Sequence, residues 1–220
     1  MKRIREAKRA LEARAKEEAA AAGSPAESAK PDSKMQYNFT DPESRIMKGP
    51  DGFVQGYNVQ VAVDELQLIV GHAVTQQTND KQQLMPMITT IAQQSGDMPS
   101  QLLADAGYCS DENLNAIADT TIDAYISTRK QKHGERPGPC PRGPVPKTAT
   151  RVDRMSRKLL TKTGAAVYAA RKGIVEPVIG QIKQARGFRQ FLLRGFENVY
   201  GEWSLVCTTH NILKLYRLCV

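Results

Sequence analysis

Apolar and polar side chains alternate along two short runs of the chain, at residues 57–63 and 66–74. Alternation with a period of two is typical of strands with one buried face. The runs are separated by Asp64 and Glu65, which suit a turn. Residues 56–75 are therefore predicted to form an antiparallel hairpin.

The next apolar pattern has helical spacing. Apolar residues at i, i+3, i+4 and i+7 predict a helix over 84–91, which Asn79 or Asp80 would cap. Pro86 lies too far inside this pattern for a first-turn proline, so it is expected to bend the helix.

Two short apolar runs, at 101–104 and 121–128, are predicted to be buried strands. Between them, Ser110 is placed to cap a helix that extends through Ile117. Residues 129–150 are rich in proline, glycine and basic side chains, and are predicted to form a loop.

Helical patterns return at 151–171, 174–187 and 196–219. In the last helix one face carries the large apolar side chains Phe196, Val199, Trp203, Val206, Leu213 and Tyr216, which are expected to be buried. Strands alternating with helices, after an antiparallel hairpin, indicate an α/β fold with a mixed sheet.

The first 22 residues predict a helix of alternating charge with only a thin apolar stripe at Ile4, Ala7, Leu11 and Ala15. Such a helix could lie on DNA, but a solvated connector is favoured. A flexible linker follows. We therefore divide the chain into 1–40, a charged helix and linker, and a folded domain at 41–220.

Charge, cysteine spacing and hydropathy limit the classes of protein to which this chain can belong. The formal net charge is +8 and the isoelectric point is near 9.4, which favours a polyanionic partner such as nucleic acid. The four cysteines lack metal-finger spacing, which indicates reduced thiols of a cytoplasmic protein. No apolar run is long enough for a membrane span, and no signal-peptide core is evident.

Two carboxylates are candidates for a catalytic site. Asp105 follows a predicted buried strand, at the sheet edge where α/β folds bind ligands. Glu176 shares a helix face with Tyr168 and Lys183, and the cations near it are Arg171, Lys172, Lys183 and Arg186. Acids ringed by cations suit Mg²⁺ and a DNA backbone, although on spacing alone a salt-bridged surface helix is slightly favoured.

The helix that carries Glu176 is a poor helix former, because it contains Gly173, Pro177 and Gly180. These residues favour close approach of the backbone to a neighbour or to DNA, which supports a functional role for Glu176.

The motifs ADAGY, Tyr168 to Lys183, GFRQFLLRG and EWSLVCTTHNILKL together resemble the C-terminal half of DDE transposases of bacterial insertion sequences. The resemblance begins near TDPESRIMKGPDGFVQGYNVQVAVD and runs to the C-terminus. It implies an RNase H-like catalytic domain that acts on double-stranded DNA, at element ends and target, and works as a homo-oligomer near the bacterial nucleoid, away from membranes.

In that family, Asp105 would be the second acid and Glu176 the third acid of a triad that binds Mg²⁺, with Mn²⁺ as an alternative. Tyr168, the basic position before Glu176, Lys183 and Arg186 would contact DNA. The family pattern leaves three residues between arginine and glutamate; Lys172 leaves three and Arg171 leaves four, so both stay candidates.

The first acid of the triad has no clear counterpart. RNase H-like sheets open with three antiparallel strands, whereas only two are predicted here before the first helix. Asp64 then falls in a turn, Asp80 is assigned to a helix cap, and Asp41 and Asp51 have no strand context. The first strand would be missing and the sheet incomplete.

Two functions follow. The chain is expected to be an N-terminally truncated transposase for Mg²⁺-dependent DNA cleavage and strand transfer. The alternative is a non-catalytic, DNA-binding remnant of a transposase. A resolvase-like or RNase H-like nuclease fits the C-terminal motifs less well.

Overall fold

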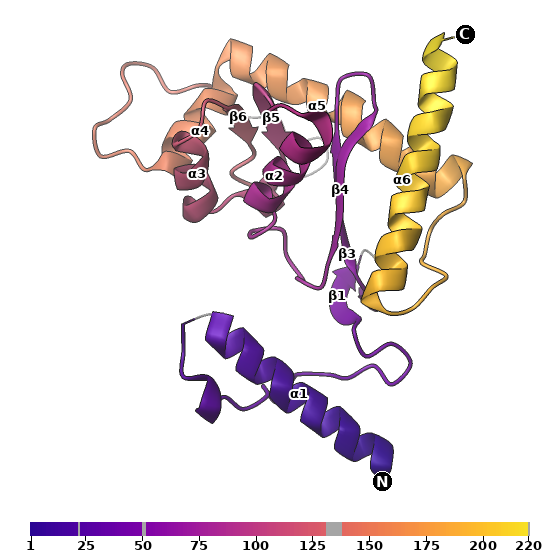
Figure 1. The fold of residues 1–220 in the computed structure, drawn as a ribbon. Coiled ribbons are helices and arrows are strands. Elements are labelled where there is room, and N and C mark those ends of the chain that lie inside the picture. The colour runs from indigo at the N-terminus through magenta and orange to yellow at the C-terminus, as the bar shows by residue number, and fades with distance from the viewer. Residues whose placement is uncertain (22, 50–51, 131–137, 220) are drawn as a thin grey trace.

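A computed structural model of the chain describes residues 1–21, 23–49, 52–130 and 138–219. Its strands are β1 (Arg45–Gly49), β2 (Gly52–Gly56), β3 (Asn58–Val63), β4 (Ile69–Thr75), β5 (Gln101–Ala104) and β6 (Asp123–Ile126). Its α-helices are α1 (Lys2–Ala21), α2 (Leu84–Ser95), α3 (Asp111–Ala118), α4 (Arg151–Leu160), α5 (Lys162–Gly180) and α6 (Phe196–Cys219). Helix α1 lies apart from an α/β body that the other elements form (Figure 1).

The described strands form three two-stranded sheets, rather than the single mixed sheet expected. β1 pairs with β2 and β3 with β4, both antiparallel, whereas β5 and β6 are parallel. Four strands therefore precede the first helix of the body, and the predicted number of two was wrong. β1 and β2 were missed because Arg45, Lys48 and flanking glycines interrupt any apolar alternation.

The predicted hairpin is confirmed in β3 and β4, with Asn58 opposite Thr75 at its open end. Asp64 forms its turn as expected. Its carboxylate accepts the backbone N–H groups of Leu66 at 3.0 Å and Leu68 at 2.7 Å. Such side-chain bonds to nearby backbone are the usual reason for aspartate in turns.

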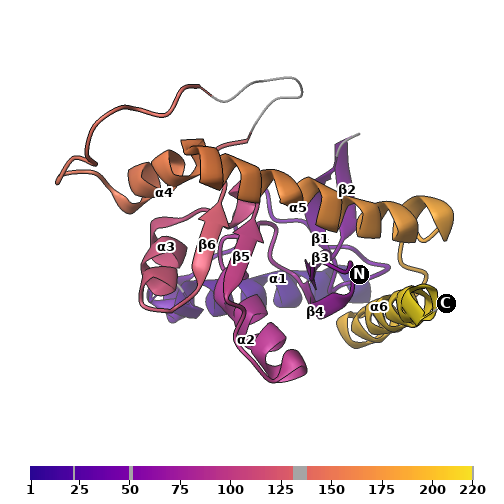
Figure 2. The same cartoon turned by 90° about the horizontal axis from the view of Figure 1, so that it is seen from above.

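The body has two hydrophobic cores, one on each pair of strands. The first joins β3 and β4 to α5 and α6 through buried residues that include Val178, Ile182 and Trp203. The second joins β5 and β6 to α2 and α3 through residues that include Ile88, Leu114 and Ile126. Figure 2 shows α5 running along one side of both strand pairs, with α2 on the other side.

The start of α2 differs from the prediction. Its N-cap is Gln83, without a side-chain cap bond, so the assignment of Asn79 or Asp80 as the cap was wrong. Pro86 is the third residue of the helix and falls within the first turn, where backbone N–H groups have no partner in the helix. Pro86 therefore breaks no hydrogen bond of the helix, and the reason for expecting a bend there does not apply. Ser110, by contrast, caps α3 as predicted and accepts from Asn113.

The break between the next helices lies at Thr161, not at residues 172–173 as predicted. Thr161 caps α5 by accepting the Gly164 N–H, and it ends α4. A Cβ on Gly164 would lie 1.9 Å from the Lys158 carbonyl oxygen, so only glycine fits this elbow. Local spacing could not locate the break, because it depends on how closely two helices meet.

Gly173 and Pro177 both lie inside α5, and the hairpin turn explains how Pro177 is accommodated. Pro177 has no N–H, so it leaves the carbonyl of Gly173, four residues earlier, without its helical partner. Gln67 at the hairpin turn donates its side-chain Nε2 to that carbonyl at 3.1 Å. A π-helical turn, Gln181–Ala185, then continues the helix.

Helix α6 packs along the outer edge of β4. Asn211 accepts the N–H of Ile69 and donates to its carbonyl, each at 2.8 Å, so its amide completes hydrogen bonding at the strand's edge. Val199, Trp203 and Val206 are buried as predicted. Leu213 and Tyr216 were expected to be buried and are exposed, because the helix continues beyond the hairpin.

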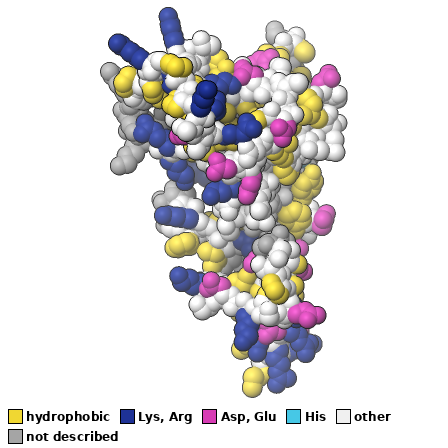
Figure 3. Space-filling model, turned by 90° about the vertical axis from the view of Figure 1, so that its left-hand side faces the viewer, with side chains coloured by type: hydrophobic (Ala, Val, Ile, Leu, Met, Phe, Trp, Pro, Cys, Tyr) yellow, Lys and Arg dark blue, Asp and Glu magenta, His cyan; other side chains and the backbone are white. Residues whose placement is uncertain are grey.

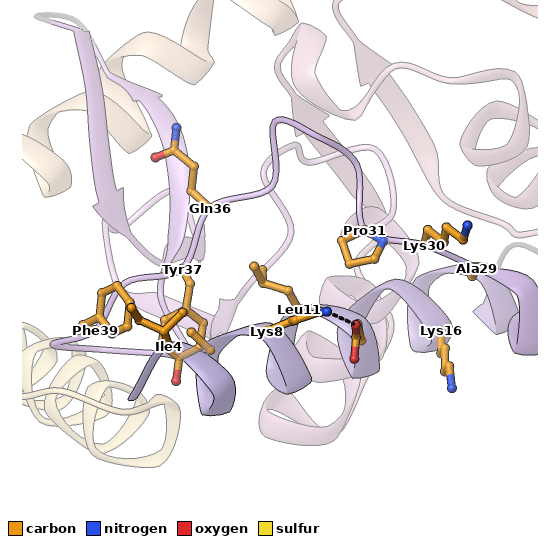
Figure 4. Close-up of a pocket in the computed structure, with 12 residues that line it drawn as sticks. Ile4, Lys8, Leu11, Lys16, Ala29, Lys30, Pro31, Gln36, Tyr37 and Phe39 are labelled. Atoms are coloured by element: carbon orange, nitrogen blue, oxygen red, sulfur yellow. Dashed lines mark ion pairs between the residues drawn. The ribbon is translucent and has the colours of Figure 1, made fainter. Parts of the chain in front are cut away.

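Helix α1 agrees with the predicted charged helix and packs on the segment that follows it. Ala7 and Ala15 are buried against this segment, whereas Ile4 is exposed. A hollow of about 910 Å³ lies between α1 and the segment that follows it (Figure 4), and Tyr37 and Phe39 of that segment face the helix. This arrangement fits a connector helix with few apolar contacts.

Two further expectations concern the whole chain. All four cysteines are free, as their spacing predicted. No helix within the described ranges is long and apolar enough to cross a membrane. Part of the predicted loop, residues 131–137, lies outside the described residues, as does Asp51.

The contribution of the first core to stability can be tested by replacing one buried and one exposed isoleucine with alanine. Ile182→Ala should lower the free energy of unfolding by about 2–5 kcal/mol, because Ile182 is only 1% exposed and its loss leaves a cavity. The same change at Ile212, which is 62% exposed on α6, should stay within about 0.5 kcal/mol of the parent. Urea unfolding followed by circular dichroism measures both, and equal effects would contradict this core.

Candidate functional site

Asp105 lies at the end of β5, where the sequence placed it. It starts the short 3₁₀ turn Ala106–Tyr108 and accepts the Gly107 N–H at 2.7 Å. One carboxylate oxygen is thus held by the backbone while the side chain stays exposed at the rim. This is the geometry of a carboxylate that is oriented but still accessible.

A second carboxylate, that of Asp80, lies beside Asp105. A Cβ on Gly107 would be 2.7 Å from Asp80 Oδ2 and 3.0 Å from Asp105 Oδ1, so the two oxygens flank the same point. Any side chain at position 107 would collide with this pair. Gly107 therefore permits the two acids to approach.

Strand β3 holds Asp80 in place. Asn58 Nδ2 and Gln60 Nε2 donate to Asp80 Oδ1 at 2.7 and 2.8 Å, and the Tyr108 hydroxyl donates to Gln60 Oε1. Gln60 is buried, so its amide depends on these partners. The network ties the start of β3 to the end of β5.

Sequence reasoning missed this role of Asp80 because it treated the residue as a local helix cap. The available signal was the pair of amides at alternate positions 58 and 60 in an otherwise apolar strand. Alternate positions share a strand face, so two amides there indicate a buried polar partner.

Tyr108 is held neutral at this site. Burial first, and then the charges of Asp80 and Asp105, raise the pKa of its phenol above the ordinary value of 10.0. The hydroxyl therefore stays protonated and serves as a donor. Because a neutral donor adds no charge, the local field is dominated by the two carboxylates.

Glu176, the other predicted catalytic acid, is on α5 but is not among the residues that the contacts above connect. Its side chain is exposed, whereas its neighbour Val175 lines the space between the strands. Within the described residues, no group of three or more acidic, histidine or cysteine side chains is arranged to hold a metal ion. The joint role of Asp105 and Glu176 remains a prediction.

The argument that Gly173 and Pro177 indicate function is weakened by the structure. Gln67 donates to the carbonyl that Pro177 leaves without a partner, so contact with the hairpin accounts for Pro177. A Cβ at position 173 would meet nothing within 4 Å, so close approach of the backbone does not explain Gly173. The case for Glu176 therefore depends on the family pattern alone.

The predicted DNA contacts differ in accessibility. Lys172 and Lys183 are exposed on α5 and its π-turn. Arg171 stacks over Tyr168 at 5.7 Å, and Arg186 donates to the Val206 carbonyl at 3.2 Å. Arg186 is exposed as well, whereas Arg171 is half-buried, so Arg171 is the least accessible of these four cations.

Basic side chains form no single continuous patch on the face in Figure 3. They are scattered over the body among acidic side chains, and are densest at the foot, where Figure 1 places α1. On this face the body therefore shows no basic patch of the kind that marks a nucleic-acid surface.

A hollow of about 540 Å³ separates β3 from β5. Residues of β3 and β5 form two of its sides. Helix α2 adds Leu84, Met87, Ile88 and Ile91, and helix α5 adds Arg171, Ile174 and Val175. Asp80 and Asp105 lie at one end of it, and Asp64 and Glu65 at the other. Asp64 is therefore at the end of β3 away from Asp105, as its turn role requires.

Asp41, the remaining acid considered from sequence, ties two segments together. Its carboxylate accepts the Tyr57 hydroxyl at 2.8 Å and the Gly195 N–H at 3.3 Å. It is buried against these partners and lies outside the Asp80 and Asp105 site.

A comparison with protein families identifies the family of this chain. The family model described as "Transposase DDE domain" matches residues 25–212, and the chain belongs to that family. Neither the curated proteins nor the solved structures include a significant match. The family match supports a role in DNA transposition, and it includes every candidate site residue named above.

The turn role of Asp64 predicts a graded effect on stability. Asp64→Ala should lower the free energy of unfolding by about 1 kcal/mol, because two backbone N–H groups lose their acceptor. Asp64→Asn should cost less, since an amide oxygen can still accept. Urea unfolding of both variants measures this, and equal losses would contradict the hydrogen-bonding role.

Proposed function

We propose that this chain is the DNA-handling domain of an insertion-sequence transposase, and that Asp105 is a metal ligand of the assembled enzyme. The observation that carries the proposal is the position of Asp105, exposed at the end of β5 with one oxygen fixed by Gly107, in a DDE-family chain. Ligands of α/β folds bind at this end of the strands. The fold we propose is RNase H-like, with a sheet that lacks one strand.

The partner we propose is double-stranded DNA, at the element ends and at the target. The formal net charge of +8 favours a polyanion, and Lys172 and Lys183 are exposed on the element that also carries Glu176. A homo-oligomer would bring two element ends together. These contacts would position DNA without reading its sequence.

The residues present fit a divalent metal only in part. Asp105 and Asp80 offer two neighbouring carboxylates, but Asp80 Oδ1 already accepts from two amides, and no third acid joins them in the described chain. In the family, Mg²⁺ or Mn²⁺ would activate the attacking oxygen and stabilise the leaving one. Glu176, the proposed third acid, would have to reach the rim from an exposed position on α5.

The chain by itself is therefore proposed to bind DNA without cutting it. The same shortage of carboxylates favours the second candidate function, a non-catalytic DNA-binding remnant. The two candidates differ in whether Asp105 contributes to cleavage once the missing acid is supplied.

A plasmid assay tests the incomplete site. The purified chain should retard supercoiled plasmid DNA in a gel but should not nick it when Mg²⁺ or Mn²⁺ is added. Asp105→Asn and Asp64→Asn should leave binding unchanged. Metal-dependent nicking that Asp105→Asn abolishes would contradict the proposal that the site is incomplete. Nicking that is lost in Asp64→Asn would identify Asp64 as a catalytic acid.

Binding itself is tested by salt dependence. If Lys183 contacts a phosphate, Lys183→Ala should reduce the slope of log K against log salt by about 0.9. Lys30, exposed in the segment after α1, provides the matched control, and Lys30→Ala should leave the slope unchanged. Fluorescence anisotropy with a labelled duplex measures both. An unaltered slope for Lys183→Ala would remove that residue from the DNA surface.

A further inference from the structure

Strands β1 and β2 form a two-stranded ribbon that exposes large apolar side chains. Phe53 is 79% exposed and Val54 is 54% exposed, and neither belongs to the two hydrophobic cores. Within the described residues, the ribbon pairs with no other strand. Because an isolated two-stranded ribbon is only marginally stable in water, this one is a candidate for contact with a partner.

The register of the ribbon defines the face that carries Phe53. Phe53 lies opposite Lys48, and Gln55 lies opposite Ile46. Opposite residues of an antiparallel pair share a face, as do residues at i and i+2 of one strand. Lys48, Phe53 and Gln55 are all exposed. This ribbon face thus presents a cation, an aromatic ring and an amide side by side, whereas Val54 lies on the opposite face.

The base of the ribbon is fixed to the body by hydrogen bonds. Arg45 of β1 donates to the Glu43 carbonyl at 2.7 Å and to Gln76 Oε1 at 3.2 Å. On β2, Gln55 Oε1 accepts from Ser44 Oγ at 3.3 Å. A fixed element loses little conformational freedom when it binds, so the ribbon is preorganised for docking.

The ribbon leaves the body beside the candidate functional site. β2 ends at Gly56, and β3 begins at Asn58, whose side chain donates to Asp80 at 2.7 Å. Seen from above, β2 extends past α5 on the side away from α2 (Figure 2). DNA that is held at the rim with Asp80 and Asp105 is therefore within reach of the ribbon.

The chemistry of the ribbon face matches the major groove of DNA. That groove is about 12 Å wide and admits a two-stranded ribbon, and its base edges are read by apolar contact with the thymine methyl and by side-chain amides. Phe53 and Gln55 offer these two groups about 7 Å apart along the strand, which equals two base-pair steps of about 3.4 Å. Within 45–49 and 52–56, the ribbon carries the cations Arg45 and Lys48 and no acid, which suits a polyanion.

We propose that the ribbon of β1 and β2 enters the major groove of bound DNA. Phe53 contacts a thymine methyl, Gln55 forms a hydrogen bond with a base edge, and Lys48 contacts a phosphate. This inference rests on the proposed DNA-binding function and adds an element that reads bases, which the lysines of α5 do not provide. Duplexes rich in A·T pairs are the ligands that the ribbon favours.

Removal of the thymine methyl tests the contact with Phe53. Fluorescence anisotropy of the full chain is measured with labelled duplexes of alternating dA·dT and alternating dA·dU, which differ only in that methyl. The parent should bind dA·dT about fourfold more tightly, as expected for burial of one methyl group. Phe53→Ala should bind both duplexes equally. Val54→Ala, on the opposite face, is the matched control and should keep the preference of the parent.

Two further variants separate backbone contact from base reading. Lys48→Gln should lower the slope of log K against log salt by about 0.9 and leave the preference for dA·dT unchanged. Gln55→Ala should weaken binding to dA·dT by about tenfold, as expected for the loss of a hydrogen bond to a base edge. An unchanged slope, or unchanged affinity of Gln55→Ala, would contradict the corresponding contact.

Three results would overturn the proposal. The parent could bind dA·dT and dA·dU alike, since a minor-groove contact does not sense the methyl. Phe53→Ala could keep the preference of the parent. Phe53→Ala could also have a lower mass in light scattering, which would assign Phe53 to a contact between copies of this chain. Absence of DNA binding by the parent would contradict the proposed function as well, whereas binding without a methyl preference would contradict this inference alone.

Discussion

The body of this protein depends on two helices that hold two hydrophobic cores on either side of an open hollow. Helix α5 and the π-helical turn that continues it contribute Val178 and Ile182 to the first core, and α5 packs at its start against α4, which borders the second core. Helix α2 contributes Leu84 and Ile88 to the second core and lies over Gly71 of the hairpin, where a Cβ would be only 3.1 Å from Ile91. Within the described residues, no backbone pairing joins β3 and β4 to β5 and β6.

This arrangement explains how α5 forms although it contains residues that disfavour a helix. Proline and glycine within α5 would ordinarily weaken it by several kcal/mol in total. The hairpin turn compensates through Gln67, whose amide donates to Gly173 and whose own oxygen accepts from Lys214 of α6 at 2.7 Å. The weakest part of α5 is therefore the point where three elements meet, and the carbonyl that Pro177 frees is satisfied there by a tertiary contact.

Sequence patterns correctly predicted the features that depend on residues close together in the chain. The β3 and β4 hairpin, the Asp64 turn, the Ser110 cap and the rim position of Asp105 all follow from spacing over a few residues. Features set by distant partners could not be read in this way. Asp80 was taken for a cap because its amide partners lie 20 and 22 residues away, and the Thr161 elbow depends on contact between two helices.

The side chain of Asn211 completes the outer edge of β4 from 142 residues further along the chain. On the ribosome, that edge has no such partner until Asn211 has been made. The second core, by contrast, is assembled mostly from residues 84–126 and can form early. Synthesis thus yields a half-folded chain with a bare hairpin, a stage at which chaperones or self-association would compete for it.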